Sequence, residues 1–165
     1  MSTGLIYETV SIDSSDTERL GELFGRFLKP PLVIELRSDL GGGKTTFVRG
    51  LARGVKSNDT VSSPTFTISR VYKFKNGEIH HFDFYRLDEA GVMADQLKES
   101  LDDKEVVTVV EWSDIVQSVL PDDRITIGFS PTANDPEERR ISISYTEKND
   151  KLIKQLETER EQLRP

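Results

Sequence analysis

The beginning of the chain alternates apolar and polar residues and then changes to a helical period. The alternation that runs from Leu5 through Tyr7 to Ser11 predicts a first strand. Ser15, followed three residues later by Glu18, forms a capping-box signal for a helix. The apolar positions of that helix recur at helical spacing: Leu20, Leu23, Phe24, Phe27 and Leu28. A Pro-Pro pair then ends the helix, so this segment is expected to serve packing rather than function.

The middle of the chain contains short apolar runs that predict buried strands, with helices between them. Leu32–Leu36 is typical of a buried strand that leads into a glycine-rich loop. A helix over about Lys44–Arg53, closed by Gly54, is expected to follow. Leu87–Leu101 is acidic and more helical, whereas the β-branched run Val106–Val110 is typical of a central strand.

Further strand patterns complete a sheet. Thr65–Phe74 and Glu78–Phe84 are rich in β-branched and aromatic residues, and Asn76-Gly77 between them predicts a β-hairpin. Two later strands are expected near Arg124–Phe129 and Arg140–Tyr145. We therefore expect an α/β fold whose mixed sheet is parallel in its centre and antiparallel at one side.

Composition narrows the possible chemistry. The 165 residues, of which 35% are hydrophobic, fit one domain with a real core. Because the chain has no cysteine and only two histidines, a bound metal is expected to have oxygen ligands, which favours Mg²⁺. A formal charge of -7 disfavours direct nucleic-acid binding, except through a local patch or a partner. The sequence has neither a secretory signal nor roughly 20 consecutive apolar residues, which predicts a cytoplasmic protein with no membrane contact.

The strongest chemical signal lies between a predicted strand and a predicted helix. The segment from Ser38 to Thr45 matches G-x-x-x-x-G-K-[ST], except that Ser38 stands at the first glycine. Backbone N–H groups and the helix N-terminus can converge there on phosphates, with Lys44 reaching the β and γ oxygens and the Thr45 hydroxyl ligating Mg²⁺. The predicted nucleotide-binding residues are Asp39, Leu40, Gly41, Gly42, Gly43, Lys44, Thr45 and Thr46. The alternative is a glycine-rich turn with an incidental lysine, but the flanking elements favour a P-loop NTPase-like, three-layer fold that binds ATP.

A P-loop also needs an acidic partner for the metal at the end of a neighbouring strand. Glu111 directly follows the predicted central strand, which would bring its carboxylate to the same sheet edge as the P-loop. An ordinary solvated strand-end glutamate is the alternative. Asp83 is the second candidate, because an acid between Phe82 and Phe84 points away from them and needs a polar partner.

Four short motifs follow one another along the chain: Asp39 to Thr46, Ser63 to Thr67, His81 to Arg86, and Val110-Glu111-Trp112. In this order and spacing they resemble the bacterial TsaE (YjeE) family, over about Ser11 to Tyr145. The resemblance implies a Mg²⁺-dependent ATPase subunit, weak without its partners, that supports formation of threonylcarbamoyladenosine in tRNA. It also implies TsaD and TsaB as partners, with tRNA contacted only indirectly through the complex.

The resemblance further implies roles for individual residues. Lys44 is similar to the phosphate lysine of the family, and Thr45 and Glu111 to its Mg²⁺ ligands. Asp83 resembles a second metal-shell or water-orienting acid. Thr65, in the Ser-Pro-Thr loop, resembles a switch residue that senses the γ-phosphate and so belongs with the catalytic candidates.

Other positions carry less specific expectations. Arg86 and Trp112 are candidates for a supporting role at the site, but an ion pair and a packed tryptophan explain them equally well. His80 and His81 alternate across a strand, so at most one faces the site, and neither is expected to bind metal. In the family the adenine side lies near the first strand and helix, which points to Asp13–Thr17.

The end of the chain differs from the rest in composition. Residues 1–146 are predicted to form the P-loop ATPase domain, and 147–165 a charged C-terminal tail or helix. Leu152, Leu156 and Leu163 form only a sparse helical stripe, which favours a solvated or frayed helix over one that docks on a partner.

Three functions are compatible with a P-loop. The leading hypothesis is an ATP-driven switch that reports hydrolysis to partner proteins. A small-molecule kinase is the first alternative, although no arginine-rich lid segment is apparent. The second alternative is a nucleotide-dependent adaptor without appreciable turnover.

Overall fold

The computed structural model describes residues 4–39, 41–64, 67–89 and 91–163. Its strands are β1 (Leu5–Ser11), β2 (Leu32–Arg37), β3 (Ser69–Phe74), β4 (Gly77–Asp83), β5 (Val106–Glu111), β6 (Ile125–Pro131) and β7 (Arg139–Tyr145). Its α-helices are α1 (Ser14–Phe27), α2 (Lys44–Gly54), α3 (Val92–Asp102) and α4 (Asp150–Leu163), with short 3-10 turns η1 (Ser113–Val116) and η2 (Glu147–Asn149). No helix in these ranges is long and apolar enough to cross a membrane.

The seven strands form one mixed sheet in the order β1-β7-β6-β2-β5-β4-β3. The four central strands β6, β2, β5 and β4 run parallel. The expected α/β class and the parallel centre are therefore confirmed, but the antiparallel strands occur at both edges rather than at one. At one edge of the sheet, β3 pairs with β4 in an antiparallel hairpin. At the other edge, β7 pairs antiparallel with β6, and β1 pairs antiparallel with β7.

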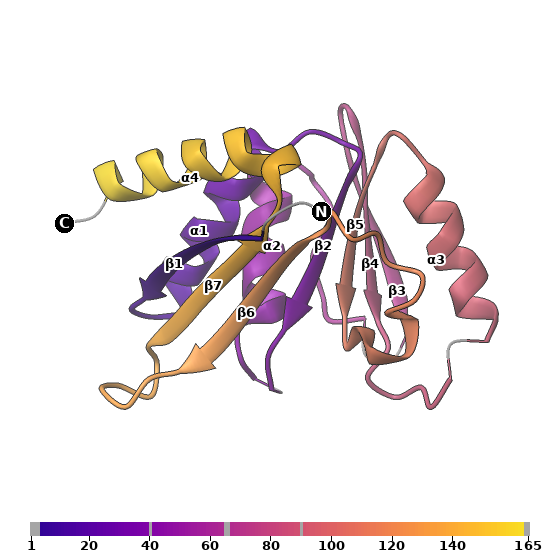
Figure 1. The fold of residues 1–165 in the computed structure, drawn as a ribbon, viewed down its shortest axis with the longest axis horizontal. Coiled ribbons are helices and arrows are strands. Elements are labelled where there is room, and N and C mark those ends of the chain that lie inside the picture. The colour runs from indigo at the N-terminus through magenta and orange to yellow at the C-terminus, as the bar shows by residue number, and fades with distance from the viewer. Residues whose placement is uncertain (1–3, 40, 65–66, 90, 164–165) are drawn as a thin grey trace.

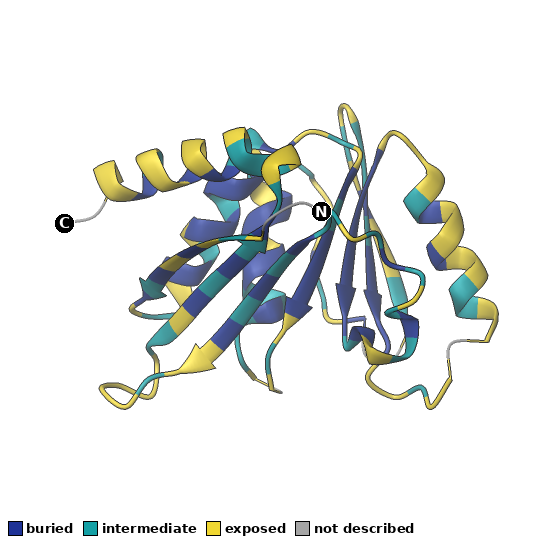
Figure 2. Cartoon of the chain, viewed as in Figure 1, coloured by how far each residue is buried: buried dark blue, intermediate teal, exposed yellow. Residues whose placement is uncertain are grey.

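Helices cover both faces of this sheet, which gives the expected three layers (Figure 1). The larger apolar core joins α1, α2 and α4 to one face, and a smaller one joins α3 and η1 to the other. Every residue of β5 is buried, whereas β6 and β7 alternate between buried and less buried positions (Figure 2). A β-branched strand covered on both faces belongs at the centre of such a fold, as the sequence predicted.

The P-loop helix α2 is held against α1 by close backbone contact. A Cβ at Gly50 would overlap the carbonyl oxygen of Glu18, and one at Gly54 would overlap that of Glu22. Gly54 was expected to close α2, but it is the last helical residue and serves this close approach instead. The left-handed residue after the helix is Lys56, with φ of 66°. The two helices therefore pack at the distance that glycine permits.

The predicted start of α1 is also wrong in detail. Asp13, and not Ser15, is the N-cap residue, and its Oδ1 accepts a hydrogen bond from the backbone N–H of Asp16 at 2.8 Å. The carboxylate of Asp13 competes successfully because aspartate and serine are comparable N-caps. The helix consequently begins at Ser14, two residues earlier than the capping-box pattern indicated.

The C-terminal helix α4 is not a solvated or frayed element. Ile153 and Leu156 are fully buried in the larger core, and Arg160 is buried as well. Figure 2 shows exposed residues on the outer side of α4 and buried ones on the side that faces the body. Of the predicted stripe only Leu156 is buried and Leu163 is exposed, whereas Ile153 and Arg160 complete the buried face of the helix.

Candidate nucleotide-binding site

The glycine-rich loop lies at the carboxyl end of β2 and turns directly into α2. Gly41 and Gly43 have φ of 78° and 106°, which a residue with a Cβ adopts only with strain. Gly43 is the N-cap of α2, so the first backbone N–H groups of the helix face the loop. Ser38, the departure from the motif, is not in the left-handed region. Its substitution for glycine is therefore compatible with the turn.

Lys44 is the first residue of α2 and is buried, with only 6% of its surface exposed. Its Nζ donates to the carbonyl oxygen of Ser38 at 3.0 Å and lies 4.5 Å from the ring centroid of Trp112. Burial lowers the pKa of Lys44, while the charges of Glu111 and Asp83 act in the opposite direction. The ammonium is thus held inside the loop between a carbonyl, an aromatic face and two carboxylates.

The two predicted acids meet at the same sheet edge. Asp83 ends β4, Glu111 ends β5, and the two residues are paired in the parallel register of these strands. They are 4% and 3% exposed. Because Leu36 is the register partner of Glu111 on β2, both acids lie on the sheet face that α2 covers. A neighbouring pair of buried carboxylates is electrostatically unfavourable unless cations compensate it.

Each acid has a defined partner within the chain. The backbone N–H of Tyr85 donates to Asp83 Oδ1 at 2.9 Å. His81 Nε2 donates to Glu111 Oε2 at 2.5 Å, and its other ring nitrogen lies 3.4 Å from the Tyr72 hydroxyl. That hydroxyl donates to the carbonyl oxygen of Ser62 at 2.9 Å. A buried chain of polar groups therefore connects Glu111 to the loop that contains Ser63.

A single pocket of about 390 Å³ brings these groups together. Its size is in the range of small-ligand sites. The lining includes most of the predicted nucleotide-binding and metal residues, together with residues of α1 and of the β6–β7 connection: Ser14, Thr17, Gly41, Gly42, Gly43, Lys44, Thr45, Thr46, Ser63, Asp83, Glu111, Trp112, Pro136, Glu137 and Arg139.

The remaining candidates have varied positions. Asp39 is exposed, and its carbonyl oxygen accepts from the Gly42 N–H at 3.1 Å. Leu40 and Thr65 lie outside the described residues. Arg86 is exposed, whereas Trp112 is half-buried with φ of 54° and contacts the Tyr85 ring, the centroids lying 4.9 Å apart.

Two buried polar groups have partners that the sequence did not predict. His81 was expected only not to bind metal, and in the structure its ring contacts Glu111, the predicted metal acid. Glu35 is fully buried in β2, inside a run that looked apolar. An acidic residue at an interior strand position was the available signal, since such a residue is seldom buried without partners.

Glu35 lies on the sheet face opposite to Glu111. Its carboxylate accepts from Arg124 Nε at 3.1 Å, Thr126 Oγ1 at 3.0 Å, Arg37 Nη2 at 3.1 Å and Gln117 Nε2 at 2.5 Å, and from the Ser113 hydroxyl. Burial raises the pKa of Glu35, but these hydrogen bonds outweigh it and bring the pKa from 4.5 to about 2. This cluster ties β2 to β6 and η1.

The open side of the pocket fits a hard divalent cation. One threonine hydroxyl and two carboxylates are oxygen donors of the kind that Mg²⁺ prefers, and Mg²⁺ commonly keeps several waters. Within the described ranges, no group of three or more His, Asp or Glu side chains could hold a metal ion by itself. Thr45, Asp83 and Glu111, which line the pocket, are thus the residues that could hold Mg²⁺ here.

Comparison with known proteins gives a consistent result. Residues 11–141 match the family model described as threonylcarbamoyl adenosine biosynthesis protein TsaE. The chain is 32% identical to the tRNA threonylcarbamoyladenosine biosynthesis protein TsaE of Bacillus subtilis, over 81% of this chain and 82% of that protein. It is 36% identical to the protein of the same name from Treponema pallidum, over 76% of this chain and 92% of that one. A crystal structure of Bacillus subtilis YdiB superposes with a TM-score of 0.74 at 28% identity, over 96% of this chain and 97% of that one.

Proposed function

This chain belongs to the TsaE family, and from that premise we propose that it binds and hydrolyses ATP with Mg²⁺ in support of threonylcarbamoyladenosine formation in tRNA. The observation that carries the proposal is the pocket itself. It combines the P-loop, Lys44, and the carboxylates of Asp83 and Glu111 in one cavity. A phosphate-binding loop beside two buried acids is the combination that a metal-bound nucleotide requires.

The protein groups have separate tasks in this mechanism. The backbone N–H groups from Gly41 to Thr46 bind the β- and γ-phosphates, because these amides converge at the start of α2. Lys44 exchanges its Ser38 carbonyl for a phosphate oxygen, which replaces a neutral acceptor by an anionic one. Thr45, Glu111 and Asp83 would hold Mg²⁺, which neutralises charge that develops on the phosphates.

The second acid also suits the orientation of water. Asp83 is fixed by the Tyr85 N–H on one oxygen, so its carboxylate has a defined direction at the pocket wall. A carboxylate held in this way can accept a hydrogen bond from an attacking water and align it. Thr65 remains a proposed γ-phosphate sensor of the same reaction.

The proposed partners are TsaD and TsaB, with tRNA bound through the complex. The formal charge of -7 supports this division, because an acidic protein does not by itself attract a polyanion. Hydrolysis would change the loop around Thr65, and the partners would sense that change. Ser63, which precedes Thr65, lines the pocket. Co-precipitation with TsaD and TsaB in ATP and in ADP tests the partner assignment.

Substitution of Lys44 by alanine tests the nucleotide assignment. Productive ATP binding or hydrolysis should be lost while the fold persists, because the charge that meets the phosphates is removed. Arg49→Ala, an exposed position on the same helix, is the matched control and should keep wild-type turnover. Wild-type ATP turnover of Lys44→Ala, measured with the partners present, would contradict the proposal.

The same assay separates the alternative functions. A small-molecule kinase would pass the γ-phosphoryl group to an added acceptor, whereas the proposed ATPase releases inorganic phosphate. A nucleotide-dependent adaptor would bind ATP without appreciable phosphate release even when TsaD and TsaB are present.

A further inference from the structure

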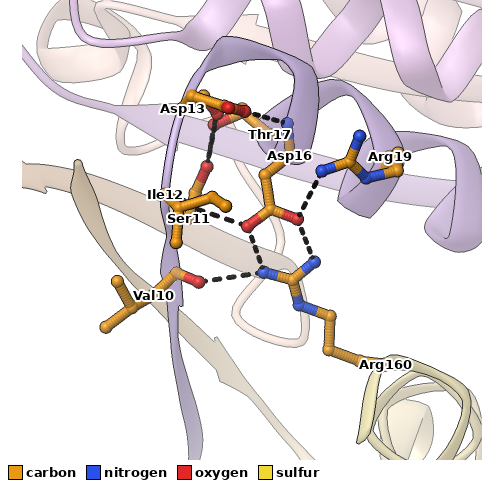
Figure 3. Close-up of polar contacts among 8 residues, drawn as sticks. All are labelled: Val10, Ser11, Ile12, Asp13, Asp16, Thr17, Arg19 and Arg160. Atoms are coloured by element: carbon orange, nitrogen blue, oxygen red, sulfur yellow. Dashed lines mark hydrogen bonds and ion pairs between the residues drawn. The ribbon is translucent and has the colours of Figure 1, made fainter. Parts of the chain in front are cut away.

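The C-terminal helix reaches the first turn of α1 through a buried ion pair (Figure 3). Arg160 of α4 is 5% exposed, and its two terminal nitrogens donate to the two carboxylate oxygens of Asp16 at 2.6 and 2.9 Å. The nitrogen at 2.9 Å also donates to the carbonyl oxygen of Val10 in β1, again at 2.9 Å. The guanidinium of Arg160, 144 positions from Asp16 in the sequence, therefore joins the end of β1 to the start of α1.

The opposite side of the same turn forms part of the nucleotide pocket. Ser14 and Thr17 line that pocket. The Thr17 methyl group would lie 3.7 Å from a Cβ placed on Gly43 of the P-loop, and the Thr17 hydroxyl lies 2.6 Å from the Ser11 hydroxyl. The turn is thus bounded by the P-loop on one side and by Arg160 on the other.

Arg160 holds the carboxylate of Asp16 in its buried position. Burial raises the pKa of Asp16, but the hydrogen bonds from Arg160 and from the Ile12 N–H bring it below its usual value. Arg19 also approaches the carboxylate, but at 3.5 Å and with 59% of its side chain exposed. Without Arg160 the carboxylate would be left buried and incompletely paired, so the turn would relax towards solvent.

We propose that Arg160 is a positioning residue for the nucleotide pocket: by holding Asp16 it sets the wall formed by Ser14 and Thr17, so docking of α4 and nucleotide affinity are coupled. This inference rests on the proposed function. Coupling of this kind is reciprocal, so bound nucleotide must stabilise the docking of α4 as much as docked α4 improves nucleotide binding.

Affinity for ATP with Mg²⁺ in three variants tests the coupling, at a temperature at which circular dichroism shows each variant to be folded. Arg160→Met keeps the length of the side chain but removes the bidentate bond, and should weaken binding by about tenfold. Arg160→Lys keeps the charge without the fork and should give an intermediate loss. Arg19→Met removes the exposed contact to the same carboxylate and should leave the affinity unchanged.

Hydrogen exchange provides a readout that a merely structural role would not move. In the wild-type protein, addition of ATP with Mg²⁺ should slow exchange of the α4 amides, and this slowing should disappear in Arg160→Met. Wild-type affinity in folded Arg160→Met, or α4 exchange in the wild type that ignores nucleotide, overturns the inference. If Arg160→Met does not fold, Arg160→Lys and the wild-type exchange decide.

The same experiment distinguishes failure of the inference from failure of the proposed function. Absence of ATP binding by the wild-type protein would remove both. Normal wild-type binding with equal affinity in Arg160→Met and Arg19→Met would remove the coupling alone.

Discussion

Two buried carboxylate sites lie on opposite faces of the central sheet and differ in how their charge is balanced. On one face, Glu35 accepts hydrogen bonds from five side chains, two of them arginines. On the other, Glu111 and Asp83 are register partners on adjacent strands, with Lys44 near both. The first site is closed around one charge, whereas the second brings two negative charges to a pocket wall.

Burial alone therefore does not identify a functional carboxylate. Glu35 is the most buried of these acids, yet its neighbours satisfy it and hold its pKa at about 2. Glu111 and Asp83 concentrate like charge where a cation can enter, an arrangement that costs stability unless a ligand compensates it. A site whose negative charge is compensated only when a ligand binds is the better candidate for function.

Unfolding free energies should separate the two sites most clearly. Glu35→Gln removes the charge and turns one carboxylate oxygen, which accepts from either two or three donors, into an N–H₂ donor. We therefore expect a loss of roughly 3–5 kcal/mol, typical of breaking one partner of a buried ion pair. Glu111→Gln relieves repulsion with Asp83 and should change stability by less than about 1 kcal/mol. Urea unfolding without nucleotide measures both. Equal losses in the two variants would contradict the comparison.

Acid should reduce the contribution of Glu35 to the free energy of unfolding over a defined pH range. The folded-state pKa of Glu35, about 2, lies below its ordinary value of 4.5, so its contribution is fully present above pH 4.5 and is lost as the pH falls towards 2. A shift of this size corresponds to about 3 kcal/mol. Asp16, whose pKa is also lowered, adds in the same direction.

The matched control for the acid prediction is Glu35→Gln, which has no carboxylate to titrate at this position. Its unfolding free energy should fall less steeply than that of the wild type between pH 4.5 and pH 2. Parallel pH profiles for the two proteins would show that the acid dependence originates elsewhere.

The rate of ATP hydrolysis should depend on the pocket carboxylates Glu111 and Asp83. Glu111→Gln keeps the side-chain volume but removes a charge that would hold Mg²⁺ or its waters, so hydrolysis should fall by a factor on the order of a hundred or more. Nucleotide binding and partner docking should survive better, because the P-loop amides and Lys44 remain. Phosphate release in the partner complex is the measurement.

Glu105→Gln is the matched control for this change, since Glu105 is exposed just before the other end of β5. It should hydrolyse ATP at the wild-type rate. Normal hydrolysis by Glu111→Gln would instead assign the metal acid to Asp83 and contradict the proposed layout.

Removal of Mg²⁺ should have the smallest of these effects. Chelation should weaken nucleotide binding by about tenfold, because Thr45 and the two acids then face the phosphates without a cation between them. Zn²⁺ should restore binding less well than Mg²⁺, since the site offers no thiolate. Unchanged affinity after chelation would count against Thr45 and Glu111 as ligands.

Local sequence patterns predicted much of the fold. The β-branched run before Glu111 predicted a central strand, Asn76-Gly77 predicted the hairpin, and the segment from Ser38 to Thr45 predicted a strand-loop-helix unit. Each of these signals depends on neighbours within a few residues, where backbone preference and periodicity act directly. The family was recognisable for the same reason, because its motifs are short and contiguous.

Other features were decided only by the tertiary structure. The side chain of Glu35 meets Arg124 across 89 positions of sequence, and Arg160 meets Asp16 across 144. No local pattern contains both partners, so the sequence could not show whether these charges are solvated or paired. The burial of Lys44 and the docking of α4 were missed likewise, because both depend on surfaces that distant segments provide.

The sequence by itself therefore determined the P-loop, the order of the central elements and the family of this protein. Which charges are enclosed, which face the pocket, and which helix reaches the turn beside it follow only from the tertiary structure. The physical reason is that backbone conformation responds to adjacent residues, whereas the free energy of a charge depends on everything within a few ångströms in space.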